Sequence, residues 1–430
     1  MMADIISGGS RFTGDKKAPV RKVIQLNTDN TDNNKDNIRQ TAVTEEEDYE
    51  EVRQRIVRHR IRMGALIILI IALIAGAVVL ALHLLDGYTY TTYSVTGSIN
   101  REDTATSQYI AYEGGYIKYS NDGASYYTDK GKAIWNQTYS MQKPQVKMCE
   151  DCVAVGDING NTVYVFNKTG MLGKIDTSLV ISQIEVAANG AVVAVLEDNE
   201  ANYINMYSKE GTKIYSIKTT VSGDGYPLDV SISNDATKLI ASYVYVSGED
   251  IKTNVVFYNF SEVGQNETER VVGGFNHYND TLVGDVQFLS NNTAVAIGED
   301  VISIYKIKEY PSLEKEIHID NAINRVFFSQ DYIGVIVDNS ASGELYKMLV
   351  YNTSGGKVCE TQFGTQVENI TFDNKSVVMS NSTTLSIYNL SGKNIANMNF
   401  DMPASKVIAI GTRGEYVLVS AKYIQNIKLK

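Results

Sequence analysis

The stretch VSISNDATKLIASYV, at residues 230–244, carries the pattern that decides the fold. An apolar strand breaks at the polar pair Asn234-Asp235 and then resumes, which is typical of two antiparallel strands joined by a tight turn. The pattern recurs as IEVAANGAVVAVLED (184–198), VQFLSNNTAVAIGED (286–300), VFFSQDYIGVIVD (326–338), ITFDNKSVVMSNS (370–382) and VIAIGTRGEYVLVSA (407–421). Repetition of one hairpin indicates a repeat architecture.

An aromatic residue recurs in step with these hairpins, near the end of a further apolar strand, and a turn that often contains glycine follows it. These residues are Tyr127, Phe166, Tyr207, Tyr258, Tyr305, Tyr351 and Tyr388, at spacings of 39, 41, 51, 47, 46 and 37 residues. Helical patterns are nearly absent after Leu85. Four short strands in each unit of about 40 residues are the signature of a β-propeller blade.

The repeats predict seven complete blades and one incomplete blade. The complete blades are expected at about 108–141, 144–178, 182–221, 227–276, 283–320, 322–365 and 366–402. The eighth begins at Pro403 and reaches Lys430 after about three strands. Its outer strand is expected within 88–99 (YTYTTYSVTGSI), so that the two ends pair and leave no open sheet edge. The predicted fold class is all-β, an eight-bladed propeller, with a seven-bladed ring as the alternative if irregular units merge.

Ahead of the repeats, residues 64–85 (GALIILIIALIAGAVVLALHLL) form a run of 22 residues with no charge except a potential one on His83. As a helix, such a run is about 33 Å long, which matches a hydrocarbon core of about 30 Å. The run predicts one transmembrane helix. It divides the chain into a tail (1–63), a membrane segment in contact with the lipid bilayer (64–85) and a propeller (86–430).

The residues that flank this run predict its orientation. Just before it stand five arginines, and after it no Lys or Arg occurs until Arg101; the five are Arg53, Arg55, Arg58, Arg60 and Arg62. By the positive-inside rule, the N-terminus is cytoplasmic and residues 86–430 lie outside. The expected location is therefore the cell membrane, in a single-pass topology.

The tail before the arginines is rich in Asn, Asp, Thr and Lys and ends in the acidic run 45–51. This composition predicts disorder for residues 1–52. The acidic run followed by the basic run could also form a juxtamembrane helix with pairs such as Glu51 and Arg55. The short apolar island 18–26 (APVRKVIQL) could dock on a cytoplasmic partner, although a solvated tail is the preferred interpretation.

Charge and cysteine content exclude several classes of function. Residues 64–430 carry 39 acidic and 27 basic side chains, a balance that argues against nucleic acid as a partner. Three cysteines in the whole chain make a disulfide-knit ectodomain improbable.

Residues 125–135 (SYYTDKGKAIW) resemble the repeat of quinoprotein-type propellers, in which an apolar strand, a Gly-Lys turn and a Trp recur. The hairpin motif resembles the inner strands of WD40-type repeats. One membrane helix followed by such degenerate repeats is similar to the DUF5711-like proteins of unknown function, over about residues 50–430. This resemblance implies a membrane-anchored propeller of a Gram-positive bacterium and leaves its activity open.

Quinoprotein dehydrogenases build their cofactor site on a tryptophan platform, acidic calcium ligands and often a vicinal disulfide. This chain has Trp135 alone, so no cofactor is expected. Propellers that share these repeats without the cofactor act as scaffolds in the cell envelope. The resemblance therefore implies a scaffold.

Two short motifs are candidates for other chemistry. Cys149-Glu-Asp-Cys152 could be a pair of turn thiols, a local disulfide, or a redox or metal site; the first interpretation is preferred and the disulfide comes second. The stretch 157–162 (DINGNT) resembles the start of a calcium loop. It has Thr162 where that loop needs Gly, so a hairpin turn at Asn159-Gly160 is expected and no metal.

No catalytic residue is expected. Only His277 and His318 lie after the membrane segment, and no GxSxG motif occurs. Propeller glycosidases take their catalytic carboxylates from separate blades. A cluster of carboxylates with shifted pKa values at the central channel would therefore indicate an enzyme.

The sequence therefore favours a non-catalytic, membrane-anchored propeller that binds an envelope protein as a scaffold. A sensor of a ligand or cell-wall glycan that signals to the tail is one alternative, and a propeller hydrolase is another.

Overall fold

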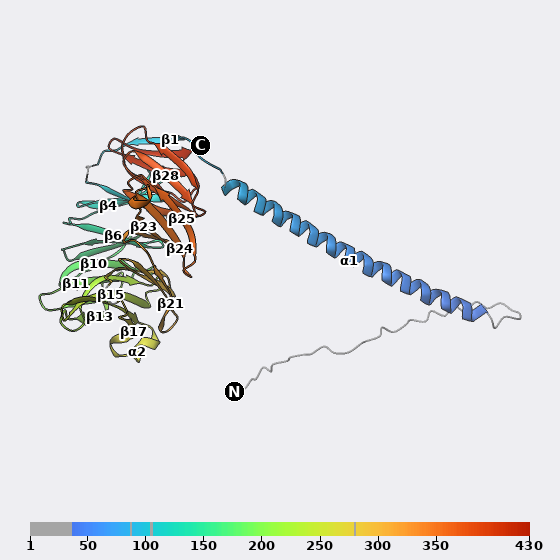
Figure 1. Cartoon of the computed structure of the whole chain (residues 1–430), viewed down its shortest axis with the longest axis horizontal. Coiled ribbons are helices and arrows are strands. Elements are labelled where there is room, and N and C mark those ends of the chain that lie inside the picture. Colours follow the sequence, from blue (N-terminus) through green and yellow to red (C-terminus); the bar gives the residue numbers. More distant parts are fainter. Residues whose placement is uncertain (1–36, 87, 104–105, 279–280) are drawn as a thin grey trace, which may run out of the picture. The chain divides into compact units, whose positions relative to one another are not determined.

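The computed structural model describes residues 37–86, 88–103, 106–278 and 281–430. They fall into two compact units, divided after Leu82. The first unit is helical, and the second consists of strands with a few short helical turns (Figure 1).

The helix α1 (Asn37–Asp86) runs for 50 residues without interruption. An 18-residue window within its segment Arg53–Ala77 has a mean hydropathy of 2.1, and the segment is long and apolar enough to cross a membrane. Large apolar side chains on it, such as Ile68 and Leu73, are exposed, and the segment is not buried against other described residues. The predicted apolar run 64–85 lies wholly within α1.

The helix begins earlier than the sequence suggested. Residues 37–52, which we expected to be disordered with a juxtamembrane helix as the alternative, are helical. Glu and Arg have high helix propensities, and an acidic run that precedes a basic run by one turn favours a continuous helix. The remaining tail, including the island 18–26, lies outside the described residues.

From Tyr93 onward the described residues form eight four-stranded antiparallel sheets, the blades of a propeller. Blade 1 is β2 (Gln108–Tyr112), β3 (Gly115–Ser120), β4 (Gly123–Thr128) and β5 (Ala133–Thr138); blade 2 is β6 (Pro144–Cys149), β7 (Cys152–Asp157), β8 (Thr162–Asn167) and β9 (Gly170–Asp176). Blade 3 is β10 (Val180–Val186), β11 (Val192–Glu197), β12 (Asn202–Tyr207) and β13 (Lys213–Thr219); blade 4 is β14 (Tyr226–Ile232), β15 (Lys238–Ser247), β16 (Asp250–Asn259) and β17 (Val271–Phe275).

The second half of the ring repeats the same order of strands. Blade 5 is β18 (Val283–Ser290), β19 (Thr293–Gly298), β20 (Val301–Ile307) and β21 (Pro311–His318); blade 6 is β22 (Ile323–Phe328), β23 (Tyr332–Asp338), β24 (Tyr346–Asn352) and β25 (Lys357–Phe363). Blade 7 is β26 (Asn369–Asp373), β27 (Ser376–Ser380), β28 (Thr384–Asn389) and β29 (Asn394–Asn399); blade 8 is β30 (Ala404–Ala409), β31 (Glu415–Ser420), β32 (Tyr423–Leu429) and β1 (Tyr93–Asn100). Short helical turns α2 (Glu262–Gln265), η1 (Thr268–Arg270) and η2 (Ser340–Ser342) lie in the connections of blades 4 and 6.

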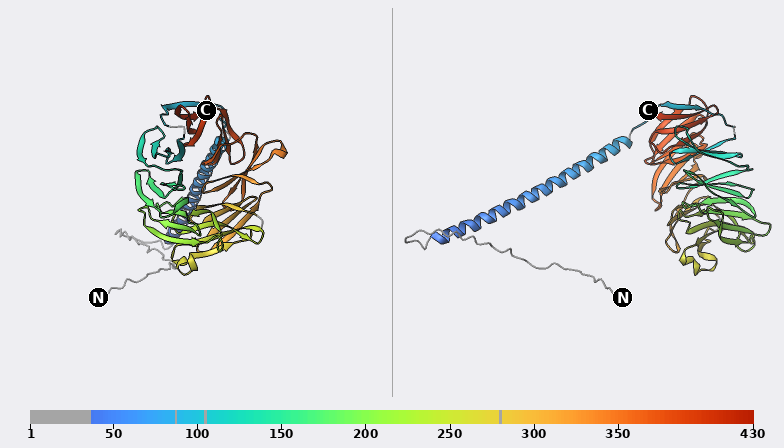
Figure 2. Two further views of the ribbon diagram at one scale, coloured as in Figure 1. Left: turned by 90° about the vertical axis from the view of Figure 1, so that its left-hand side faces the viewer. Right: turned by 180° about the vertical axis from the view of Figure 1, so that it is seen from behind.

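Blade 8 closes the ring with strands from both ends of the propeller, as predicted. β1 pairs with β32 from Tyr93 opposite Leu429 to Asn100 opposite Tyr423. Backbone hydrogen bonds extend this pairing, because Lys430 N–H donates to Thr92 O at 2.8 Å. In Figure 2 (left), β1 in light blue lies beside the red C-terminal strands, and the blade colours follow one another around the ring. The prediction of eight blades is confirmed.

The hairpin turns form where the polar pairs were found. In blade 3, Gly190 has a φ of +84°, and its N–H donates to Ala187 O at 2.9 Å. Only residues that tolerate positive φ fit such a turn at low cost.

The core lies between blades rather than within them. One cluster joins Val193 and Ile204 of blade 3 to Val230 and Leu239 of blade 4, and comparable clusters span other blade boundaries. Because each sheet buries its faces only against its neighbours, the blades stabilise one another around the ring.

Candidate functional site

The first strand of each blade lies toward the centre of the ring, and polar side chains link neighbouring first strands. Val286 N–H on β18 donates to Asp229 Oδ2 on β14 at 2.8 Å, and Phe288 N–H donates to Ser231 Oγ at 2.9 Å. On the other side of the ring, Lys406 Nζ on β30 donates to Asn369 Oδ1 on β26 at 2.7 Å. These strands therefore present functional groups to a shared central region.

Charged residues recur at one structural position on these strands. Asp229, Asp285, Arg325 and Lys406 each follow a β-bulge at the start of the strand. A bulge re-aims the side chains beside it and is common next to functional sites. The sign of the charge changes around the ring, from acidic on blades 4 and 5 to basic on blades 6 and 8.

We define the acidic arc as Glu185, Asp229 and Asp285, on β10, β14 and β18 of three successive blades. Lys147 on β6 contacts the Glu185 carboxylate, whose side chain is 12% exposed. Burial raises the pKa of all three carboxyls of the acidic arc, and the charge of the same ammonium opposes each rise.

Burial dominates the electrostatics of the acidic arc. It raises the pKa of Asp229 to about 7, with further upward contributions from Glu185 and Asp285 and opposing ones from the Val286 N–H and Lys147. Burial likewise raises the pKa of Glu185 and of Asp285, and Lys147 opposes both shifts. A cation that binds beside carboxylates with raised pKa values stabilises their charged form. Near neutral pH, Asp229 can also gain or lose a proton.

We define the basic arc as Arg325 and Lys406, on β22 and β30. Arg325 donates to Glu368 O at 3.1 Å and borders a cavity of about 330 Å³ between blades 6 and 7. Lys406 borders a cavity of about 470 Å³ at the first strands of blades 7, 8 and 1, and burial lowers its pKa. The basic arc thus borders open space, and hydrogen bonds between blades occur in both arcs.

The two predicted cysteines face each other at the end of blade 2. Cys149 and Cys152 are paired across the β6–β7 turn, and both thiols are free. Cys152 Sγ lies 3.0 Å from Ala188 O as a donor, and burial raises the pKa of Cys149 to about 12. A raised thiol pKa opposes redox or metal chemistry, so turn thiols without a function stay the prediction for this pair.

The residues that resembled a calcium loop form a hairpin. Asp157 Oδ1 accepts hydrogen bonds from the backbone N–H groups of Gln142 and Lys143, each at 2.9 Å, and Asn159 turns the chain with a φ of +69°. Within the described ranges, no group of three or more His, Cys, Asp and Glu side chains could hold a metal ion.

The remaining candidates take structural positions. Trp135 stacks on Phe166 of the next blade with ring centroids 4.6 Å apart, and its Nε1 donates to Asn167 O at 2.9 Å. His277 and His318, which gave no pattern in the sequence, both contact Glu316, at 2.8 and 3.2 Å. The topology arginines Arg53 to Arg62 lie exposed on α1, and their role in orientation stays a prediction.

The acidic and basic arcs were not found from the sequence. The five tetrapeptides that follow the bulges share a polar or charged first residue and an aliphatic second one: QIEV (183–186), DVSI (229–232), DVQF (285–288), RVFF (325–328) and KVIA (406–409). Aligning the repeats on these tetrapeptides would have put Asp229, Asp285, Arg325 and Lys406 in one column, with Glu185 two positions later in its own repeat.

Residues 86–429 match DUF5711, described as a family of unknown function. The chain belongs to the DUF5711 family. No curated protein matches this DUF5711 chain. Among solved structures, BamB from Moraxella catarrhalis is similar with a TM-score of 0.51 and 11% identity, over 78% of this chain and all of BamB.

A second similar structure is Sqt1 from Chaetomium thermophilum, bound to the N-terminus of the ribosomal protein L10. Its TM-score is 0.49 at 10% identity, over 80% of this DUF5711 chain and 98% of Sqt1. At these identities the likeness to BamB shows the propeller fold, which agrees with the observed eight sheets.

Proposed function

We propose that this protein is a non-catalytic binding scaffold of the cell envelope, anchored by α1, whose propeller lies outside the cytoplasm and binds a protein partner through the acidic arc. One arrangement carries the proposal: three carboxyls lie on the first strands of neighbouring blades, and Lys147 contacts one of them, Glu185. Burial raises the pKa of each carboxyl, and Lys147 opposes each rise. Such an arrangement is completed by a further cation.

The partner of the acidic arc is a protein segment with Lys or Arg side chains. The propeller is acidic overall, which steers a basic partner toward it and disfavours acidic ones. The Arg residues at positions 53–62 would keep the other end of the chain cytoplasmic, where the tail is free to meet a second partner.

A crosslinking pull-down from native membranes tests the proposal. The informative variant is Asp229→Asn with Asp285→Asn, because Asn removes the charge and keeps an oxygen that can accept the Val286 hydrogen bond. Arg325→Gln with Lys406→Gln is the matched control on the basic arc. We expect the acidic-arc variant to lose the partner by about fivefold or more and the control to retain it. Equal capture by both variants would reject the acidic arc as the binding site.

A propeller hydrolase is the second candidate, favoured by one observation. Asp229 has a pKa raised to about 7 by burial, as expected of a general acid near neutral pH, and Glu185 lies on the first strand of the neighbouring blade. Hydrolysis of a cell-wall glycan that disappears in Asp229→Asn would support this candidate over the scaffold.

A further inference from the structure

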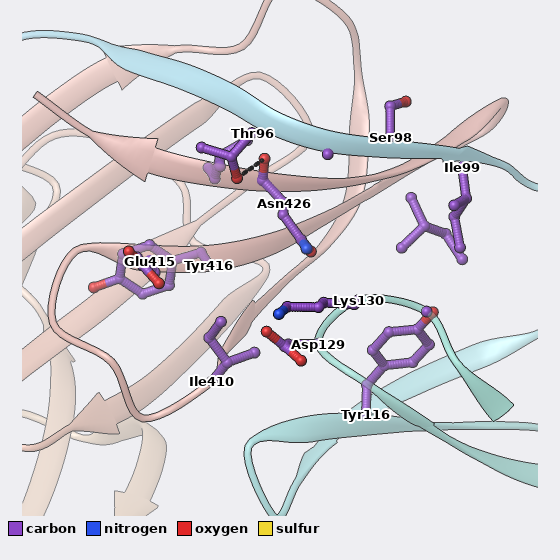
Figure 3. A pocket seen from close by; sticks show the side chains of 14 residues that line it. Thr96, Ser98, Ile99, Tyr116, Asp129, Lys130, Ile410, Glu415, Tyr416 and Asn426 are labelled. Atoms are coloured by element: carbon purple, nitrogen blue, oxygen red, sulfur yellow. Dashed lines mark hydrogen bonds between the residues drawn. The ribbon is translucent and has the colours of Figure 1, made fainter. Parts of the chain in front are cut away.

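A cavity lies at the seam where the two ends of the propeller close the ring. Its volume is about 470 Å³, and it separates blade 8 from blade 1. One wall comes from β1 and β32, including Ile99 and Asn426, and the other from Tyr116 on β3 and the β4–β5 turn that carries Asp129 and Lys130. Figure 3 shows Asn426, Asp129 and Lys130 around the space between β1 and this turn.

Tyr116 supplies the strongest sign of a ligand. Its side chain is 1% exposed, yet its hydroxyl has no hydrogen-bond partner among the described residues. Its ring stacks on Tyr127 with centroids 5.4 Å apart, so the ring is held while the hydroxyl is left unsatisfied. A buried hydroxyl without a partner costs free energy, and a ligand or water that hydrogen-bonds to it would remove that cost.

The other lining groups define the chemistry of the ligand. Asn426 offers a carboxamide that can donate and accept, and three charged residues line the cavity, Asp129, Lys130 and Glu415. Glu415 is paired with Lys428 at 2.8 Å. Ile99, Ile410 and Ile424 supply apolar walls. Burial raises the pKa of Tyr116 to about 12, so its hydroxyl is neutral and can both donate and accept.

We propose that this seam cavity binds a saccharide. Neutral hydroxyl and carboxamide groups match the hydroxyls of a sugar ring, and aliphatic walls match its C–H faces, in a volume within the range typical of small-ligand sites. Lys130 and Lys428 balance the charges of Asp129 and Glu415, which disfavours a strongly charged ligand. The site is separate from the acidic arc and does not depend on it.

The position of the cavity gives binding a structural consequence. Thr96, on its wall, is a β-bulge residue of β1, and its hydroxyl donates to Asn426 O at 3.2 Å across the β1–β32 pair. β1 follows α1 after a few residues and closes the ring. A bound saccharide would therefore stabilise the strand that joins the propeller to the helix, which gives the sensor alternative a physical basis.

The test uses the full-length protein in detergent micelles with chitotriose, a neutral oligosaccharide, as the probe. The key variant is Tyr116→Phe, which keeps the ring and removes the unsatisfied hydroxyl. Tyr119→Phe is the matched control, since that hydroxyl donates to Gln108 at 2.7 Å, outside the cavity. Binding is measured by saturation-transfer NMR and calorimetry, and Tm by the fluorescence of the single Trp135.

We expect the wild type to bind chitotriose and Tyr116→Phe to bind about five to ten times more weakly, with Tyr119→Phe unchanged. Without ligand, Tyr116→Phe should have a Tm equal to or above that of the wild type, because a buried unpaired hydroxyl is gone. A folded Tyr116→Phe variant that binds as the wild type does would overturn the proposal. The proposal would also be overturned if the wild type bound no chitotriose, or if it bound free glycine, a zwitterion, instead of chitotriose.

Discussion

The acidic arc and the basic arc of the ring use the same structural position for opposite purposes. Asp229 and Asp285 follow a bulge in blades 4 and 5, as Arg325 and Lys406 do in blades 6 and 8. Hydrogen bonds join neighbouring first strands in both arcs, and the basic arc also borders cavities of about 330 and 470 Å³. The blade repeat therefore fixes where a functional group stands, and the residue at that position decides what it binds.

The largest expected difference concerns the single cation of the acidic arc. Lys147→Ala leaves the Glu185 carboxylate, 12% exposed, without its partner, and should lower the free energy of unfolding by about 2–3 kcal/mol. Lys406→Ala should cost less than about 1 kcal/mol, because Lys406 bonds to the neutral Asn369. Urea unfolding of the full-length protein, followed by Trp135 fluorescence, measures both. Equal losses would remove the energetic distinction between the arcs.

The next effect is a pH dependence that belongs to the acidic arc. The pKa of Asp229 is about 7 in the folded protein and about 3.8 when unfolded, so the unfolded chain gives up its proton first as the pH rises. Stability should therefore fall between about pH 4 and pH 7, by about 1–3 kcal/mol. Asp229→Asn should remove this fall in stability with pH, and Lys406→Gln should retain it. The profile is measured as the urea midpoint against pH; a slope that survives in Asp229→Asn contradicts the assignment.

A smaller effect comes from the hydrogen bonds that bridge blades 4 and 5. Ser231 is 1% exposed and accepts the Phe288 N–H at 2.9 Å, so Ser231→Ala leaves that donor unpaired and should cost about 1–2 kcal/mol. The control on the other side is Ser405→Ala, where an exposed hydroxyl donates to Val419 O at 3.1 Å and its loss should be close to neutral. Thermal unfolding of the two variants measures their losses of stability. A larger loss in Ser405→Ala than in Ser231→Ala would contradict this prediction.

Much of the fold could be predicted, because the propeller repeats its signals. Polar pairs such as Asn189-Gly190 mark turns by local backbone chemistry, and eight units at nearly regular spacing leave little choice of architecture. The pairing of β1 with β32 followed from the need to cover a sheet edge. The start of α1 at Asn37 was missed, since composition suggested disorder where Glu and Arg in fact continue the helix.

The candidate sites could not be predicted in the same way. Whether Asp229 and Asp285 share a face depends on bulges that shift the register by one residue, and no residue pattern in a single blade reveals that shift. Burial of Tyr116 arises from the meeting of blades 8 and 1, whose residues are far apart in sequence. Cys149 and Cys152 were visible as a motif, but the burial that raises the pKa of Cys149 was not.

The most direct test of the central claim is site-specific photocrosslinking from two matched bulge residues. Gly284 precedes Asp285 on the acidic arc, Ser405 precedes Lys406 on the basic arc, and both are exposed, so each accepts a photoreactive side chain. We predict that position 284, in native membranes, crosslinks to a protein within a Lys- or Arg-rich segment identified by mass spectrometry, that added salt weakens the product, and that position 405 gives little. A crosslink of equal yield from position 405, or one from 284 to an acidic or apolar segment, would contradict the account.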